Sequence, residues 1–324
     1  MKSEATILIV THNSLPFLKA TINSIRKAQT NVNYEILVVD NGSTRETGDY
    51  LKNEGIGFIR NNKNMGYIEA QGQAFQKIGT PYLCSCNDDI LVTDFWLDKL
   101  LTKLRGNKNI KIAAPVKWGS RTTYPSDKNL SSREAWEQVK NEWGGDVDPF
   151  GMARKFTKGK TLEEFGEDFR VTNKLKDAII ESPPDFIAGF CFLTETSIWK
   201  KLGGFVDPNM KAYGTEDIER CWRLGIVGYK IIRTSDVYVH HFEGASVNRN
   251  NIDTSRMLVR NNRVILKKYG KFLWSWLGSQ LRDKSMEEIV REYWVVGKLL
   301  KNSPNGAIPD KIGKVWRKYA KNNS

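Results

Sequence analysis

The first 116 residues alternate short apolar runs with segments of helical periodicity, and this alternation restricts the fold more than any other feature of the sequence. The apolar runs are Thr6–Val10, Tyr34–Asp40, Ile56–Arg60, Tyr82–Cys86 and Ile110–Val116. The segments between them have the apolar spacing of amphipathic helices, at residues 15–26, 44–53, 66–78 and 94–104. This alternation predicts an α/β fold with an open, Rossmann-like, mostly parallel sheet flanked by helices, whose ligands bind beyond the carboxyl ends of the strands.

The rest of the chain is expected to add a helical insertion and a helical C-terminal tail. Strand signals are missing from residues 119–185, where we predict helices at 131–143 and 162–181. Strand signals return at 186–193, 230–233 and 237–241, with a helix near 216–224. From residue 254 onward the pattern is helical, and its first apolar stripe consists of Ile265, Leu266, Tyr269, Phe272, Leu273, Trp276 and Leu277.

Positive charge is concentrated at the C-terminal end of the chain. Residues 263–324 hold 14 basic and 5 acidic side chains, which is +9 of the net charge of +13, and they include Trp274, Trp276, Trp294 and Trp316. A basic, Trp-rich segment favours an anionic partner, such as a membrane surface, nucleic acid or an acidic polymer. The alternative is a packed helical tail with a solvated Lys and Arg face, and the sequence leaves both open.

The cysteines and the N-terminal residues favour a cytoplasmic location. Four Cys in 324 residues are not a disulfide framework, and no second Cys pair has zinc spacing, so we interpret Cys84, Cys86, Cys191 and Cys221 as buried thiols. No apolar run is long enough to cross a bilayer, and no signal-peptide core follows Met1. We therefore expect a reduced, cytoplasmic protein, or one bound peripherally at the inner face of the membrane.

Polar residues follow the first three predicted strands. Thr11 and Asn13 come after the first strand, Asp40 ends the second, and a turn with Asn64 and Gly66 joins the third to a helix. Asp40 would face the ligand crevice and accept from a base or ribose, unless it only belongs to a turn that caps the next helix. A glycine-containing turn at a helix N-terminus suits a phosphate or a ribose. Because the G-x-G-x-x-G and P-loop glycines are missing, dinucleotide hydride chemistry and P-loop phosphoryl transfer lose support.

The triplet Asn87-Asp88-Asp89 brings two adjacent carboxylates to the end of an apolar strand. Two such carboxylates raise each other's pKa unless a cation neutralises them. A hard divalent ion would do so and would keep open positions for diphosphate oxygens. The alternative is an N-cap for the helix that starts near residue 94, but one acid would suffice for that.

A second acidic pair, Glu216-Asp217, precedes a predicted helix, and His240-His241 ends a late strand. The acids either favour the helix dipole or supply a general base to the crevice. Successive strand residues point to opposite faces, so only one of the two histidines can face a site, where it would suit a metal.

In this order, the motifs resemble those of the family 2 glycosyltransferases of GT-A fold, especially the rhamnosyltransferase-like branch. The ordered set is Thr11-His12-Asn13, Asp40-Asn41-Gly42-Ser43, Asn61-x-x-Asn64-x-Gly66, Asn87-Asp88-Asp89, Gly203-Gly204-Phe205-x-Asp207, Glu216-Asp217 and His241-x-x-Gly244-x-Ser246. The resemblance covers about residues 5–250 and departs from the family's D-x-D pattern at Asn87, where we expect lower metal affinity.

The resemblance implies where a nucleotide sugar binds. Thr11 and Asp40 would line the nucleobase pocket, and Asn13 would also contact the nucleotide sugar. Asn64 and Gly66 would lie near the ribose and the diphosphate. The donor would be a nucleoside-diphosphate sugar, with UDP or dTDP as the nucleotide.

The resemblance also implies the metal site and the base. Asp89 and His241 would hold Mn²⁺ or Mg²⁺, and Asp88 would contact the ribose or a metal-bound water. Asp217 would be the catalytic base, with Glu216 beside it. The implied reaction is a single inverting displacement in which Asp217 takes the proton of an acceptor hydroxyl.

These roles suggest a division of the chain into four parts. Residues 1–118 would bind the nucleotide sugar, 119–185 would be the insertion on the acceptor side, 186–262 would be the acceptor and catalytic half, and 263–324 would be the basic tail. The family's usual acceptor is a glycan or a lipid-linked glycan. A modified base in DNA, a non-catalytic carbohydrate- or nucleic-acid-binding protein and a nucleotidyltransferase are the alternatives, and Thr11–Pro16 lacks the basic loop that the last would need.

Overall fold

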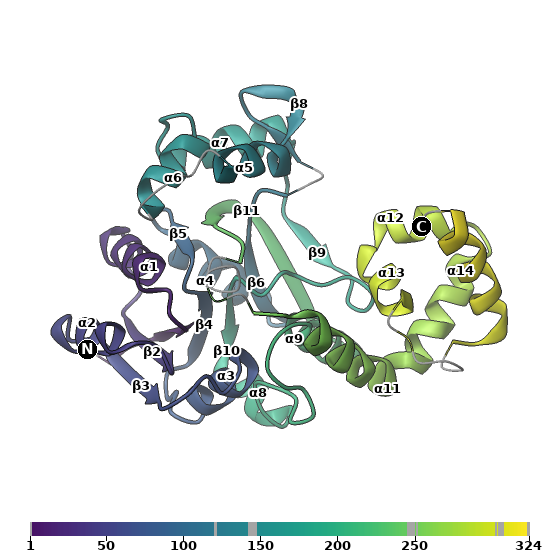
Figure 1. Cartoon of the computed structure of the whole chain (residues 1–324), viewed down its shortest axis with the longest axis horizontal. Helices are drawn as coiled ribbons and strands as arrows, with labels where there is room; N and C mark the ends of the chain where they lie inside the picture. Colours follow the sequence, from purple (N-terminus) through teal and green to yellow (C-terminus); the bar gives the residue numbers. More distant parts are fainter. Residues whose placement is uncertain are drawn as a thin grey trace.

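A computed structural model describes residues 2–119, 122–141, 148–244, 250, 252–301, 303 and 308–322. Its centre is a nine-stranded sheet in the order β3-β2-β1-β4-β10-β6-β11-β5, with β9 paired to β11 (Figure 1). The strands are β1 (Ala5–Thr11), β2 (Tyr34–Asn41), β3 (Gly57–Asn61), β4 (Tyr82–Asn87), β5 (Ile90–Val92), β6 (Ile110–Val116), β9 (Ala178–Ile180), β10 (Cys191–Glu195) and β11 (Lys230–His241). The predicted α/β fold, with a central sheet flanked by helices, is confirmed.

The N-terminal half of the sheet is parallel, as expected, and β6 and β11 are also parallel neighbours. By contrast, β10 runs antiparallel to both β4 and β6. Residues alternate between two cores along β1, because successive side chains point to opposite faces. Ile7 and Ile9 pack in one core, and Leu8 and Val10 pack in the other.

Helices cover both faces of the sheet. In the first half of the chain these are α1 (Leu15–Lys27), α2 (Arg45–Asn53), α3 (Tyr67–Phe75) and α4 (Trp96–Gly106). Later in the chain, α8 (Thr196–Lys201) and α9 (Glu216–Ile226) follow β10. Apolar side chains of α1 and α4 share a core with Ile7 and Ile9, whereas those of α3, α8 and α9 pack on the opposite face.

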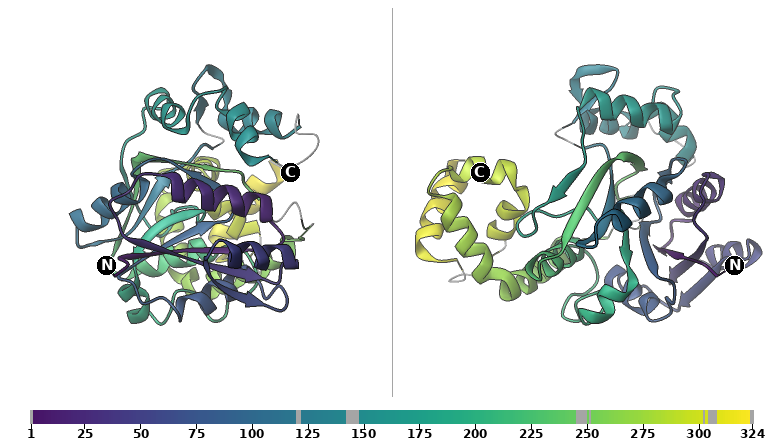
Figure 2. Two further views of the ribbon diagram at one scale, coloured as in Figure 1. Left: turned by 90° about the vertical axis from the view of Figure 1, so that its left-hand side faces the viewer. Right: turned by 180° about the vertical axis from the view of Figure 1, so that it is seen from behind.

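The insertion lies above one edge of the sheet and shares an aromatic core with residues of α1, β5 and β11 (Figure 2). Its elements are β7 (Thr123–Tyr124), β8 (Asp127–Ser131), α5 (Ser132–Asn141), α6 (Pro149–Phe156) and α7 (Leu162–Thr172). The helix predicted for 162–181 is therefore too long, because residues 178–180 form β9 and pair with β11. Gly166 lets α7 approach that strand, since a Cβ atom there would lie 2.6 Å from the Cβ of Tyr238.

Two further strand predictions need correction. The segments 230–233 and 237–241 are one strand, β11, which changes neighbours along its length from β6 and β9 to β5. The strand expected from residue 186 begins only at Cys191. Both differences arise from pairing between distant segments, which local periodicity does not encode.

The C-terminal helices are continuous with the main core. They are α11 (Ser255–Gln280), α12 (Met286–Glu292), α13 (Trp294–Lys301) and α14 (Asp310–Asn322). Most of the predicted stripe on α11 is core, and Tyr269 meets Trp222 of α9 at 5.8 Å between ring centroids. Phe272 is the exception, since 45% of it is exposed. The proposed boundary between residues 262 and 263 falls inside α11. Among the described helices, none is long and apolar enough to cross a membrane.

Candidate functional site

A pocket lies at the carboxyl ends of β1, β2 and β4, where sheets of this type bind ligands. The register sets this edge, because Val10 pairs with Asn87 and Thr11 with Asp40. Residues from eight segments line the pocket: Val10, Thr11, His12, Asn41, Asn64, Gly66, Tyr67, Asn87, Asp88, Asp89, Ala212, Tyr213, His241, Gly244, Ile252 and Met257. Six of the predicted site residues are among them, namely Thr11, Asn64, Gly66, Asp88, Asp89 and His241.

The turn before α3 is held against β2 by Asn41, a residue that we did not predict as functional. Its side-chain amide donates to Asn64 Oδ1 at 3.0 Å and to the Gly66 carbonyl at 3.2 Å, and its Oδ1 accepts from the Met65 amide at 3.1 Å. Gly66 has a φ of 99°, and a Cβ atom there would lie 2.6 Å from Cα of Ala212. Only glycine therefore suits this position.

Asp40 and Asn13 do not line the pocket, so the structure does not bring these two predicted nucleotide contacts together with the six residues above. The Asp40 carboxylate is fully buried, pairs with Arg60 and accepts from the Ser43 amide at 2.9 Å. Asn13 accepts from the Thr44 amide at 3.0 Å. The cause is the pairing of β2 with β3, which places Arg60 opposite Asp40 and directs its carboxylate into the loop that precedes α2.

Asp89 and His241 come together because β11 pairs with β5, which places His241 opposite Ile90. Asp89 Oδ1 lies 3.2 Å from His241 Nε2, and the ring of Phe190 stacks on the imidazole at 4.9 Å. A carboxylate oxygen and an imidazole nitrogen at this separation fit a single Mn²⁺-like cation. Two protein ligands would leave positions for diphosphate oxygens.

The neighbours of this pair are also hydrogen-bonded, and the side-chain amide of Asn87 lies 3.2 Å from the same Nε2 atom of His241. Asp88 Oδ2 accepts from the Thr11 hydroxyl at 2.7 Å, and Tyr67 donates to Asn87 Oδ1 at 3.1 Å. His240 points away from the pocket, as strand alternation predicts, and its ring lies 5.4 Å from that of Trp136. Burial lowers the pKa of His240 to about 3, so it is neutral in the aromatic core.

The second acidic pair stands at the start of α9. Asp217 Oδ1 accepts from the Ile218 amide at 2.8 Å and Oδ2 from the Gly189 amide at 3.3 Å. Burial raises the pKa of Asp217, against those hydrogen bonds and the charges of Arg220 and Lys298. Burial, followed by repulsion from Asp217, raises the pKa of Glu216 to about 7. A carboxylate that titrates near neutrality is suited to proton transfer.

Neither acid lines the pocket itself, and Tyr213 connects the two regions. Tyr213 lines the pocket beside Tyr67, with 6.2 Å between the ring centroids. Burial raises its pKa, and so do the carboxylates of Glu216, Asp217 and Asp89. Tyr213 therefore lies within electrostatic range of both the acidic pair and the candidate metal ligand. In the sequence, the only feature that could have indicated Tyr213 as a functional residue is its position directly before Gly214.

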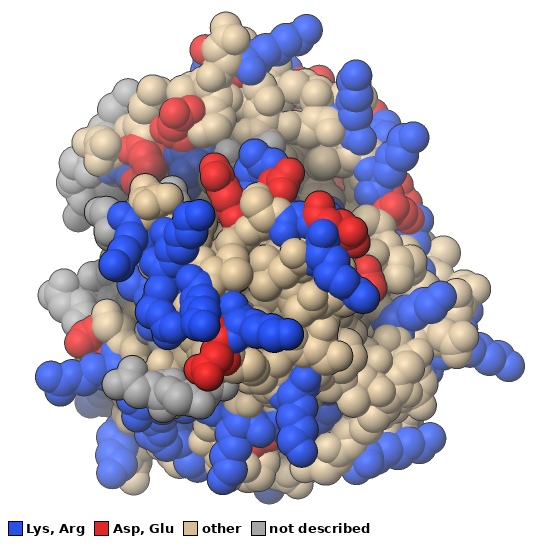
Figure 3. Space-filling model, turned by 90° about the vertical axis from the view of Figure 1, so that its right-hand side faces the viewer, with Lys and Arg blue, Asp and Glu red and all other residues tan. Residues whose placement is uncertain are grey.

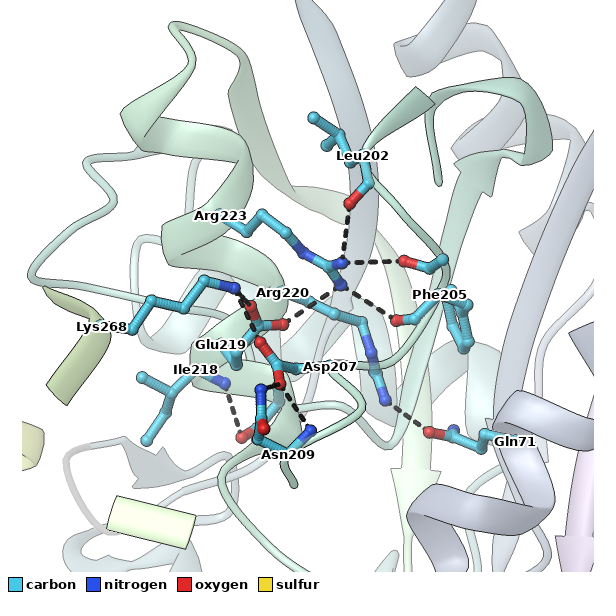
Figure 4. A network of polar contacts seen from close by, with 12 residues as sticks. Gln71, Leu202, Phe205, Asp207, Asn209, Ile218, Glu219, Arg220, Arg223 and Lys268 are labelled. Atoms are coloured by element: carbon cyan, nitrogen blue, oxygen red, sulfur yellow. Dashed lines mark hydrogen bonds and ion pairs between the residues drawn. The ribbon is translucent and has the colours of Figure 1, made fainter. Parts of the chain in front are cut away.

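A polar network around Glu219, Arg220 and Arg223 fixes the orientation of α9 (Figure 4). Lys268 of α11 donates to Glu219 at 2.7 Å and to Asp207 at 2.8 Å. Arg223 pairs with Glu219 at 3.1 Å and donates to the Gly204 carbonyl at 2.8 Å.

One turn after Glu216, the buried Arg220 donates to Gln71 of α3. Its guanidinium lies 4.5 Å from the ring centroid of Phe205. Charged groups buried this deeply are paired, and here the pairs join α9 to α3, to α11 and to the 202–209 loop. The start of α9 is thereby held in one place.

Three of the cysteines form a cluster in the core. Cys84 Sγ lies 3.7 Å from Cys86 Sγ, which lies 3.8 Å from Cys191 Sγ, and Cys221 is also a buried free thiol. In the described part of the chain, this is the only group of three or more His, Cys, Asp or Glu residues close enough to share an ion. Cys191 comes from β10, whose pairing with β4 the sequence did not predict.

Comparison with protein families finds a match to glycosyl transferase family 2 over residues 6–171. A Drosophila melanogaster protein named as a polypeptide N-acetylgalactosaminyltransferase is 23% identical over 246 residues, which is 71% of this chain and 40% of that protein. An uncharacterized glycosyltransferase of Haemophilus influenzae is 26% identical over 110 residues, which is 32% of this chain and 34% of that protein. The chain thus spans well under half the length of these curated relatives.

Two solved structures share the fold. GalNAc-T7 with UDP, GalNAc and Mn²⁺ superposes with a TM-score of 0.53 at 18% identity, over 81% of this chain and 47% of that one. The mannosyltransferase PcManGT from Pyrobaculum calidifontis, with GDP-Man and Mn²⁺, gives a TM-score of 0.51 at 14% identity, over 88% of this chain and 66% of that one. At these identities the likeness concerns the architecture.

Proposed function

The chain belongs to glycosyltransferase family 2, and on this premise we propose that it transfers a sugar, with inversion, from a nucleoside-diphosphate sugar to an acceptor hydroxyl. One observation carries the proposal: Tyr213 lies between a pocket that contains the Asp89–His241 pair and an acidic pair with raised pKa values. A donor site and a proton acceptor thus adjoin. The rhamnosyltransferase-like branch and UDP or dTDP as the nucleotide stay predictions.

The pocket residues would bind the donor. The Asn64–Gly66 turn, fixed by Asn41, presents backbone at the start of α3 to the ribose and diphosphate. Thr11 and Asp88 lie deeper, where their hydrogen bond positions the Asp88 carboxylate. Asp89 and His241 would hold the divalent cation, which supplies positive charge to the departing diphosphate.

Asp217 would then act on the acceptor. Its carboxylate takes the proton of the acceptor hydroxyl while that oxygen forms a bond to the anomeric carbon and the bond to the diphosphate breaks. The Ile218 and Gly189 amides hold the carboxylate in place during this step. A side chain at position 189 would crowd the proposed base, because a Cβ atom there would lie 3.2 Å from Asp217 Cβ.

The direct test is a panel of nucleoside-diphosphate sugars incubated with the purified protein and Mn²⁺, with released nucleoside diphosphate as the readout. We expect slow hydrolysis of one or a few donors without acceptor, and none in EDTA. Failure of every donor to bind or react would contradict the proposal and favour a non-catalytic binding protein on the same fold.

We also propose that the C-terminal helices bring the enzyme to an anionic lipid surface, where a lipid-linked glycan acceptor would reside. Lys and Arg gather on this side of the molecule (Figure 3). The exposed faces of α11 and α14 carry Arg256, Arg260, Arg263, Lys267, Lys271, Lys311, Lys314, Arg317, Lys318 and Lys321. No acidic side chain in the described residues forms an ion pair with any of them, so their charge is available to a partner.

Vesicles that contain phosphatidylglycerol should bind the protein at low salt and release it steeply as NaCl is added. The triple variant Lys314→Glu/Lys318→Glu/Lys321→Glu should bind more weakly, whereas Lys52→Glu/Lys108→Glu/Lys128→Glu, with the same net charge change at other exposed positions, should bind much as the wild type does. Equal binding by the two variants would refute the proposed surface. Tighter binding to duplex DNA in the same salt series would point to nucleic acid.

A further inference from the structure

We propose that Trp294 and Phe186 form a platform that stacks against a sugar ring of the acceptor glycan, so that the C-terminal helices complete the acceptor site. This inference rests on the proposed glycosyl transfer and names residues that would select its acceptor. Trp294 is the first residue of α13, and Phe186 lies in the loop between β9 and β10 that reaches toward α13 (Figure 1). Their ring centroids are 5.5 Å apart in an edge-to-face arrangement.

Trp294 is unusual for its exposure. Among the tryptophans in the described part of the chain it is the most exposed, at 52%, whereas Trp96, Trp118, Trp136, Trp199 and Trp222 are fully buried. The neighbours of Trp294 on α13 are core residues, since Val295 and Val296 are buried, so the helix is anchored while this ring faces solvent. An aromatic ring that is half exposed on an anchored helix is a favourable surface for the apolar face of a sugar.

The backbone connects this platform to the proposed base. Gly189, which donates to Asp217, is three residues after Phe186. Consecutive Cα atoms are about 3.8 Å apart, so the Cα atoms of Phe186 and Gly189 are within about 11 Å of each other. A glycan whose terminal hydroxyl meets Asp217 would therefore place an adjacent sugar unit at Phe186 and Trp294.

A second connection runs through α13. The Lys298 ammonium lies 5.5 Å from the ring centroid of Trp294, one helical turn along. The same charge lowers the pKa of Asp217, which puts this part of α13 within electrostatic range of the base. Two independent routes, one through the 186–189 segment and one through α13, thus lead from Trp294 to Asp217.

The test compares Trp294→Ala, Trp294→Phe and the control Phe272→Ala, which removes a ring of similar exposure from α11. Phe272 is 45% exposed and lies outside the platform. Each protein is applied to an array of immobilised oligosaccharides of defined sequence, and donor hydrolysis with Mn²⁺ is measured separately. Thermal melting checks that each variant is folded.

We expect the wild type to bind a subset of the glycans, Trp294→Ala to lose at least about tenfold in affinity for them, and Trp294→Phe to keep most of it. Phe272→Ala should match the wild type, and donor hydrolysis should be equal in all four proteins. Equal glycan binding by Trp294→Ala and the wild type, or no glycan binding by the wild type, would overturn the platform. If the wild type does not hydrolyse any donor, the proposed transferase activity is refuted instead. Because hydrolysis is measured separately from glycan binding, the two outcomes can be told apart.

Discussion

Replacing Asp217 with Asn should lower the turnover number by roughly 10²-fold or more while donor affinity is retained. Asn has the size of Asp and retains one oxygen, which keeps the 2.8 Å hydrogen bond from the Ile218 amide, whereas the longer contact from the Gly189 amide, at 3.3 Å, loses its acceptor. It cannot take up the proton of the acceptor hydroxyl. Initial rates at saturating donor, with donor affinity measured by calorimetry in Mn²⁺, separate the loss of the base from a loss of binding.

Glu216→Gln is the matched control, because it removes the neighbouring carboxylate with equally little change in shape. Glu216 is 8% exposed, compared with a partly exposed Asp217, so it is the less accessible of the two to an acceptor. We expect a smaller loss of turnover in Glu216→Gln than in Asp217→Asn. Wild-type turnover in Asp217→Asn would assign the base to Glu216 or to another group.

The pH profile gives the same experiment a second readout. A general base works only when deprotonated, so activity should fall as the pH drops through the raised pKa values of this pair. Burial raises the pKa of Asp217, so the acid limb should lie at higher pH than an exposed aspartate would give. In Glu216→Gln one negative charge is gone, and the limb should move to lower pH.

Asp89→Ala should weaken Mn²⁺-dependent donor binding by at least about 10²-fold, the upper end of what loss of an outer-sphere partner of a metal costs. The variant removes the carboxylate oxygen that lies 3.2 Å from His241 Nε2, so only the imidazole of the candidate pair would remain. Titration of the donor by calorimetry, in Mn²⁺ and in EDTA, measures the effect directly.

Asp49→Asn serves as the control for Asp89→Ala, because it removes one negative charge from an exposed position on α2. Its donor affinity should equal that of the wild type. Donor binding that is the same in EDTA as in Mn²⁺, in both the wild type and Asp89→Ala, would refute the metal site.

Local periodicity predicted β1, β2, β3, β4 and β6 with their intervening helices, and with them the edge where the pocket lies, but it did not predict β5. Thr11, Asn64, Gly66, Asp88 and Asp89 line the pocket because the carboxyl ends of parallel neighbours meet at one edge. The alternation of side chains along a strand also predicted that only one of His240 and His241 could face it. The periodicity of strands and helices and the alternation of side chains along a strand depend on neighbouring residues, so they can be predicted from the sequence.

Pairing between distant segments decided what the sequence could not. Asp40 is predicted to contact the base from its place at the end of a strand, but the sequence does not indicate that Arg60, from the neighbouring strand, lies opposite it and pairs with its carboxylate. His241 meets Asp89 only because β11 changes partners and ends beside β5.

In the C-terminal helices, some properties follow from the local sequence and others depend on tertiary contacts. The sequence by itself determined that this segment is helical, basic and amphipathic, since charge and the 3.6-residue period are local. Only the tertiary structure decided that its apolar stripe continues the main core and that Lys268 braces α9 through Glu219. It also decided that Trp294 lies against Phe186, whose loop contains Gly189, the residue that donates to Asp217. The physical reason is that burial and pairing depend on which surfaces meet, and residues more than 100 positions apart meet only in the folded chain.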